Sequence, residues 1–242
     1  MALALVEVAL LKRLPRLAHA FDYHVSGSAS RPALGSLVQC DFRGRRSLGI
    51  VVNYPERAPA VKEPKELGEV LVDQLVTPRQ LQLSWRMALH YGVAWGQVLQ
   101  LMVPVVPTRS FKVTALSDNL LNSNKVVSQS GQAPMALAIN ESKAWAQTLL
   151  QLVRKVRARE EQVLVLAPDL SQVQVLEHIL GPEFQIHKFW AQLSVSQRQH
   201  VWSEVRSGKA GIVVGTRSAL FLPYAKLGGI VVSEAHSEGY KQ

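Results

Sequence analysis

From about residue 135 onward, short apolar runs alternate with amphipathic segments, and no other feature constrains the fold as strongly. An uninterrupted apolar run is typical of a strand that is buried on both faces, as in a parallel sheet. Segments with helical spacing or helix-end signals separate these runs. The expected strands are 163–167, 186–189, 212–215 and 230–233, and the expected helices are 141–159, 172–180 and 195–206, the last capped by Ser194. This order predicts a parallel α/β sheet.

The first forty-odd residues have the period-two pattern of β structure instead. Val6, Val8 and Leu10 alternate with other residues, and Phe21–Val25 is a short aromatic and β-branched run. Ser36–Phe42 and Leu48–Val52 flank a Gly-containing basic segment, which predicts a hairpin with a basic tip. Several short strands in a small region predict a small barrel or sandwich.

Residues 55–69 are rich in Pro, Lys and Glu, and we expect a loop or linker there. Thr77-Pro78 has the form of a helix start, with Thr as the N-cap and Pro at the first helical position. Helical spacing follows to about residue 91, and a second short helix is expected at Gln97–Met102. Residues 108–134 are rich in Ser, Asn and Gln. They predict a linker between a domain at 1–107 and a domain at 135–242.

Composition excludes several classes of protein. Hydrophobic residues make up 48% of the chain, which is enough for a core, but no run approaches the roughly 18 apolar residues of a membrane helix. The apolar start Met1–Leu11 contains Glu7 and has no cleavage pattern, so we expect a strand there, no membrane association and a cytoplasmic protein. The single cysteine, Cys40, allows neither an internal disulfide nor a four-thiolate zinc site, and the histidines lack metal-ligand spacing.

The formal net charge of +9 favours a polyanionic partner such as DNA. Sequence blocks in the C-terminal half are more specific. They are Val163–Asp169 (VLVLAPD), Gly215–Phe221 (GTRSALF), Leu227–Val232 (LGGIVV), Ser233–His236 (SEAH) and Tyr240–Gln242 (YKQ). In this order they closely resemble the first motor lobe of the primosomal protein N′ (PriA) family, superfamily II helicases of replication restart.

The N-terminal half resembles the DNA 3′-end-binding domain of the same family. The resemblance rests on Phe21-Asp22-Tyr23, Gly35–Val38, Gly49–Val52, and the helix at 78–91 followed by Gly96 and Pro104. It covers about 1–107 and 135–242. It implies a small β-rich 3′-end-binding domain followed by a RecA-like parallel α/β lobe, which is a single, incomplete helicase motor.

The resemblance also implies a DNA site. Phe21 and Tyr23 would form a pocket and a stacking surface, because every base offers a face to an aromatic ring. Asp22 would accept a hydrogen bond from the terminal 3′-hydroxyl, and Gly35 would let the backbone approach the DNA closely. Arg43, Arg45 and Arg46 at the hairpin tip suit phosphate contacts, although Arg45 and Arg46 could equally form a solvated turn. Arg217 could contact DNA in the motor lobe or pair with a carboxylate.

The nucleotide motifs depart from the family. Residues 138–144, where the phosphate loop should be, contain no glycine, and Lys143 is either a remnant or a surface lysine. Ser233 stands where the family has the magnesium-binding Asp, while Glu234 and His236 remain as remnants. Since phosphoryl transfer depends on charge neutralisation, we expect no ATP hydrolysis. We also expect no cofactor: the family uses ATP, magnesium and zinc, but the zinc cysteines are absent.

Three functions stay open from the sequence. The favoured one is a DNA-binding protein for branched DNA or 3′ ends in replication, restart, repair or recombination, with restart proteins as further partners. The second is an ATP-dependent helicase completed by other parts, since the family continues past Gln242 and the chain is either truncated or a fragment. The third is a scaffold for replication proteins, which a buried Asp22 would favour.

Overall fold

The computed structural model describes residues 4–15, 19–26, 31–60, 63–104 and 142–240. Contacts between Cα atoms divide the chain into two compact units, residues 1–111 and 112–242. The linker expected at 108–134 lies outside the described residues, so its boundaries stay a prediction. Every helix among the described residues is too short or too polar to span a bilayer.

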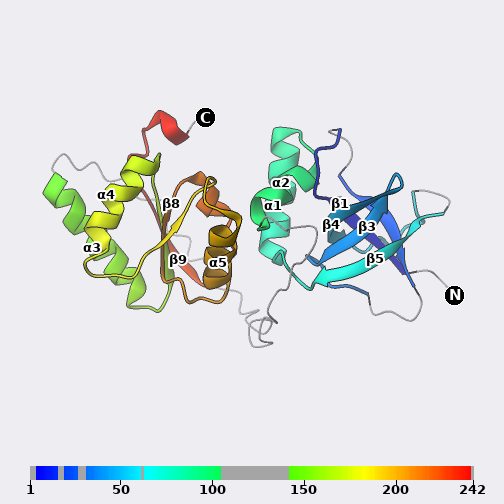
Figure 1. Ribbon diagram of the computed structural model, residues 1–242, viewed down its shortest axis with the longest axis horizontal. Helices are drawn as coiled ribbons and strands as arrows, with labels where there is room; N and C mark the ends of the chain where they lie inside the picture. The colour runs from blue at the N-terminus through cyan, green and yellow to red at the C-terminus, as the bar shows by residue number, and fades with distance from the viewer. Residues whose placement is uncertain (1–3, 16–18, 27–30, 61–62, 105–141, 241–242) are drawn as a thin grey trace. The chain divides into compact units, whose positions relative to one another are not determined.

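The first unit contains a closed five-stranded barrel (Figure 1). Around the barrel the strands follow the order β1-β2-β5-β3-β4, and only β2 and β5 run parallel. The strand bounds are β1 Ala4–Leu10, β2 Phe21–Val25, β3 Leu37–Phe42, β4 Arg45–Asn53 and β5 Lys65–Val72. The expected small β-rich domain is therefore confirmed as a barrel.

Alternation along the strands fills the barrel. Val6, Val8 and Leu10 of β1 are at most 1% exposed and pack with the inward side chains of β2, β3 and β4. Glu7 lies between them on the outer face, where it stands opposite Asp22 in the β1–β2 register. The hairpin is shorter at its tip than expected, because Arg45 and Arg46 belong to β4 and only Arg43 and Gly44 connect the strands.

The prediction of a loop over 55–69 is wrong at its end, since Lys65 begins β5. Most side chains of this strand are exposed, so the sequence has no apolar alternation that would predict a strand. Backbone pairing with β3 positions the strand instead. At Gly68 the two strands come so close that a Cβ atom would lie 2.4 Å from the carbonyl oxygen of Gln39.

Two helices complete the first unit, α1 (Pro78–Tyr91) and α2 (Trp95–Met102). Thr77 caps α1 as predicted, through a capping box with Gln80, and Gly92 ends the helix in the left-handed region at φ 58°. Helix α2 starts two residues before the predicted Gln97. The helices are joined by the Trp95 indole, whose Nε1–H donates to the buried Ser84 hydroxyl at 2.8 Å.

The second unit contains the predicted parallel sheet, in the order β7-β8-β6-β9. Its strands are β6 Gln162–Leu166, β7 His187–Phe189, β8 Ile212–Gly215 and β9 Leu227–Val232, and its helices are α3 Ser142–Arg157, α4 Leu170–Leu180 and α5 Val195–Arg206. In Figure 1, α3 and α4 lie on one side of β8 and α5 on the other. Sequence reasoning started β9 three residues late, because Gly228 and Gly229 carry no strand signal.

Candidate nucleic-acid interface

Two carboxylates stand side by side on the outer face of the barrel. Glu7 and Asp22 are direct partners in the antiparallel pair of β1 and β2. Like charges in such a position repel each other, so the pair needs a cation. Arg57, from the connection between β4 and β5, supplies it and donates to Glu7 Oε1 at 2.6 Å.

The same guanidinium holds Asp22 with two hydrogen bonds. Arg57 Nη1 donates to Asp22 Oδ2 at 2.9 Å and Nη2 donates to Oδ1 at 3.0 Å, while the Ala60 backbone N–H donates to Oδ2 at 2.5 Å. The Asp22 side chain is 3% exposed as a result. Burial raises the pKa of this carboxyl, but the hydrogen bonds and charge of Arg57 and the Ala60 N–H outweigh it, so the pKa lies below its ordinary value.

The neighbours of Asp22 in β2 point the other way, because side chains alternate along a strand. The Tyr23 ring is 3% exposed inside the barrel, and its hydroxyl donates to the Asp41 carbonyl at 3.0 Å. Burial, together with Cys40 and Asp41, raises the pKa of Tyr23. The sequence prediction made Tyr23 a stacking surface, but its ring offers no exposed face to a base.

Phe21 keeps part of its ring exposed and meets a second aromatic ring that sequence reasoning did not select. The Phe21 and Phe42 centroids are 4.9 Å apart with the rings at 62°, an edge-to-face contact. Lys12 Nζ lies 4.5 Å from the Phe42 centroid and Arg43 Cζ lies 5.4 Å from it. Cations at this distance are attracted to the ring face. Its position directly before the basic tip is the sequence signal that could have identified Phe42 as a candidate.

The hairpin tip carries the exposed arginines predicted from the sequence. Arg43 and Gly44 both have positive φ, at 54° and 75°, and the Gly44 N–H donates to Asp41 Oδ1 at 3.2 Å. Arg45 and Arg46 are exposed where β4 begins. Lys65 of β5 forms an ion pair with Asp41, and this hydrogen bond lowers the pKa of Asp41. This end of the hairpin therefore brings several cations beside Phe42.

Gly35 is placed differently from the sequence prediction. It is buried with φ +86°, and an added Cβ atom would lie 1.9 Å from the Val76 carbonyl oxygen. Its N–H donates to the Val51 carbonyl at 2.7 Å. The close backbone approach that Gly35 permits is to the segment before α1, within the unit itself.

In the second unit, Ser233 follows β9 at the carboxyl edge of the sheet. It is 1% exposed, and its hydroxyl accepts a hydrogen bond from Gln172 Nε2 at 3.1 Å. The Tyr240 hydroxyl donates to the Ser233 carbonyl at 2.9 Å, and burial, Glu234 and Asp169 raise the pKa of Tyr240 to about 12. Magnesium prefers carboxylate oxygens with bound water, which a buried, hydrogen-bonded hydroxyl does not supply. Ser233 therefore does not fit that ion.

The remaining predicted site residues are spread over this unit. Glu234 and His236 are exposed beyond β9, and Glu234 has φ 48°. Arg217 is exposed at the start of a 3-10 helix, Arg217–Phe221. Of the stretch 138–144, where the phosphate loop should be, residues 138–141 lie outside the described residues, and Lys143 lies in the first turn of α3. Among the described residues, no His, Cys, Asp and Glu cluster could hold a metal ion.

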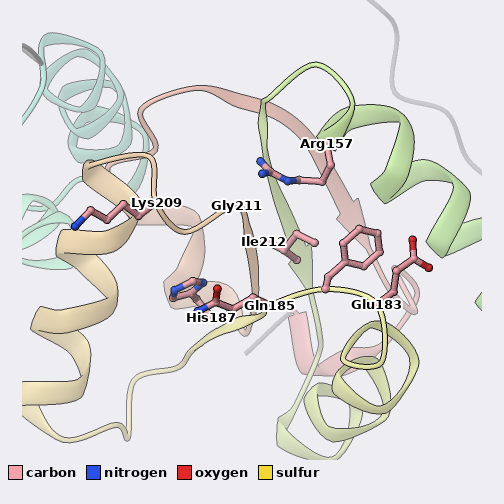
Figure 2. Close-up of a pocket in the computed structure, with 8 residues that line it drawn as sticks. Arg157, Glu183, Gln185, His187, Lys209, Gly211 and Ile212 are labelled. Atoms are coloured by element: carbon pink, nitrogen blue, oxygen red, sulfur yellow. The ribbon is translucent and has the colours of Figure 1, made fainter.

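A pocket of about 200 Å³ opens at the opposite edge of this sheet (Figure 2). His187 and Ile212, the first residues of β7 and β8, line it together with Arg157 and Gly211. Arg157 is held by a 2.7 Å hydrogen bond from Nη1 to the Glu161 carbonyl. Ligands of parallel α/β sheets bind at the carboxyl ends of the strands, so this pocket is not where a nucleotide is expected.

The two halves of the chain match known proteins to different extents. Residues 7–104 match the family model of the PriA 3′ DNA-binding domain. Replication restart protein PriA of Haemophilus influenzae is 37% identical over 95 residues, which are 38% of this chain and 13% of that protein. PriA of Rickettsia felis is 23% identical over 223 residues (86% of this chain, 34% of the relative), and PriA of Helicobacter pylori is 26% identical over 224 residues (88% and 35%).

The longer alignments run through both units, whereas the higher identity is confined to a shorter stretch. The chain spans about a third of the length of the relatives that match most of it. The barrel, the two helices after it and the parallel sheet occur in the order that the sequence blocks predicted. The chain is therefore PriA-like, and the likeness is strongest over residues 7–104, which match the 3′ DNA-binding domain of that family.

Proposed function

We propose that this chain binds DNA at 3′ ends and branched forks through its first unit, and that it acts in replication restart without hydrolysing ATP itself. The observation that most supports the proposal is the match of residues 7–104 to a 3′ DNA-binding domain. The net charge of +9 and the cations beside Phe42 agree with a polyanionic partner.

The proposed division of roles follows from exposure. Arg43 at the hairpin tip and Arg45 and Arg46 at the start of β4 bind phosphates, which gives affinity without sequence preference. The half-buried rings of Phe21 and Phe42 receive the terminal base. Asp22 accepts the hydrogen bond of the terminal 3′-hydroxyl, a group that carries no negative charge to repel the carboxylate.

The second unit is proposed to be a RecA-like lobe without catalytic activity. A hydrolytic site needs a carboxylate for magnesium after this strand, and the buried Ser233 hydroxyl is already bound to Gln172. Arg217 is proposed as a DNA contact of this lobe, and Glu234, His236 and Lys143 as remnants without a catalytic role.

Equilibrium binding to a fork tests the DNA part of the proposal. The purified chain is titrated with a fork that has a 3′-hydroxyl leading strand at the branch, at two salt concentrations, and with the same fork ending in a 3′-phosphate. We expect salt-dependent binding that is weaker for the 3′-phosphate. A parallel ATPase assay with and without DNA should show no turnover, and DNA-stimulated turnover would refute the claim of an inactive motor.

One observation favours a second candidate, an interaction scaffold for replication proteins. Asp22 is 3% exposed and already paired with Arg57, so the free protein does not present a bare carboxylate. A scaffold would bind neither fork at low salt, and its Arg45→Gln, Arg46→Gln variant would behave like the parent chain in every DNA assay.

A further inference from the structure

Arg57 occupies the acceptor that the proposed function assigns to the DNA end. Both oxygens of Asp22 accept from its guanidinium, and Oδ2 also accepts from the Ala60 N–H. With the carboxylate 3% exposed, a hydroxyl can approach it only if Arg57 moves away. The Arg57 guanidinium and the DNA 3′-hydroxyl therefore compete as donors for the Asp22 carboxylate.

The surroundings of Arg57 allow that movement. The side chain is 50% exposed, and it comes from the segment between β4 and β5 rather than from a barrel strand. Its Nη2 also donates to Glu7 Oε1 at 2.6 Å, so the guanidinium keeps one carboxylate when it leaves the other. Glu7 itself is fixed independently, because Asn53 Nδ2 donates to its Oε2 at 3.0 Å.

Arg57 also sets the charge that a DNA end meets. Glu7 and Asp22 are cross-strand partners, and one guanidinium neutralises part of both charges. Without it, the two carboxylates would repel a 3′-phosphate strongly and would accept a 3′-hydroxyl freely. The cation thus lowers discrimination between the two ends in two ways. It weakens binding of the hydroxyl by competing for Asp22, and it strengthens binding of the phosphate by attracting it.

We propose that Arg57 is the specificity-determining residue of this site: it competes with the DNA 3′-hydroxyl for Asp22 and so limits discrimination against 3′-phosphate ends. The inference rests on the proposed binding of 3′ ends at Asp22. Arg57 acts through Asp22 and is a positioning residue.

The quantity that tests it is the ratio of the two dissociation constants, 3′-phosphate fork over 3′-hydroxyl fork, measured for the full chain. Arg57→Gln is expected to raise this ratio about tenfold, the size of one charge-assisted hydrogen bond gained or lost. Arg46→Gln removes the same charge from the start of β4, where Arg46 stands opposite Asp41 in the β3–β4 register, and should weaken both forks while leaving the ratio unchanged. Arg57→Lys should return the ratio toward that of the parent chain.

A second variant keeps Arg57 in place and is expected to change the ratio in the opposite direction. In Glu7→Gln the guanidinium loses its alternative carboxylate, remains on Asp22 and should lower the ratio severalfold. Thermal unfolding of each variant identifies a misfolded one, and Glu7→Gln relieves the like-charge pair instead of exposing it. The inference therefore stays testable if Arg57→Gln does not fold.

The outcomes separate this inference from the proposed function. Suppose that Asp22→Asn brings the ratio of dissociation constants to one, but Arg57→Gln leaves the ratio unchanged or lowers it. The role of Arg57 is then refuted, and end recognition by Asp22 stands. If the parent chain binds both forks equally and Asp22→Asn has no effect, the proposed end recognition fails and the inference fails with it.

Discussion

Gly35→Ala is expected to destabilise the first unit by about 3 kcal/mol, because two separate costs combine at this position. An L-residue in the left-handed region costs roughly 1–2 kcal/mol, and Gly35 has φ +86°. The new Cβ atom would also lie 1.9 Å from the Val76 carbonyl oxygen, which forces a backbone shift. Overpacking of this kind costs about 1–3 kcal/mol.

Gly44→Ala isolates the first of these costs. Gly44 has φ +75°, but nothing lies within 4 Å of its added Cβ atom. We expect this variant to lose only about 1 kcal/mol. The difference between the two substitutions, about 2 kcal/mol, then measures the close approach to Val76.

Native-state hydrogen exchange followed by mass spectrometry is the suitable assay, because it reports the opening free energy of each unit separately. Protection in β3 and β4 should fall much more in Gly35→Ala than in Gly44→Ala, while protection in β6 and β8 should not change. Equal losses for both glycines would refute the packing explanation and leave only the backbone conformation.

Three further predictions concern other contacts. Ser84→Ala should cost about 1–3 kcal/mol in thermal unfolding, since it leaves the Trp95 N–H without its buried partner; no loss would show that water replaces the hydroxyl. Asp22→Asn should remove a stabilisation that is present above the ordinary pKa of 3.8 and is lost as the pH falls through the lowered pKa of the folded state. The free energies of unfolding of parent and variant, plotted against pH, should therefore converge in strong acid. Curves that stay parallel at every pH would contradict that sign. Ser233→Asp should destabilise the second unit by about 1–3 kcal/mol instead of creating a magnesium site, because the position is 1% exposed; magnesium-dependent stabilisation of the variant would refute this.

The parts of the fold that were predictable are those that local physics decides. Thr77 and Ser194 cap their helices as expected, and each forms a capping box with the residue three positions later. Ile212–Gly215 is a strand with the predicted bounds, because a short β-branched run between glycines favours a buried strand over a helix. In contrast, β5 was missed, since its exposed Lys and Glu side chains carry no pattern and its position follows from pairing with β2 and β3.

The candidate site was predictable only in part, for a similar reason. Phe21, Asp22 and the exposed arginines lie on the first unit as expected, but alternation along β2 turns Tyr23 into the core. The contact between Arg57 and Asp22 joins residues that are 35 positions apart, and nothing in either local segment announces it. The same holds for Lys12, which reaches Phe42 only because the barrel closes.

Fork binding by the parent chain and by Asp22→Asn, with a 3′-hydroxyl or a 3′-phosphate at the branch, decides whether the first unit recognises a DNA 3′ end. We expect the parent chain to bind the 3′-hydroxyl fork more tightly, and Asp22→Asn to remove this preference while the salt dependence of binding remains. Equal binding of both forks by the parent chain would contradict recognition of a 3′ end and would leave a basic surface that binds DNA without regard to its terminus.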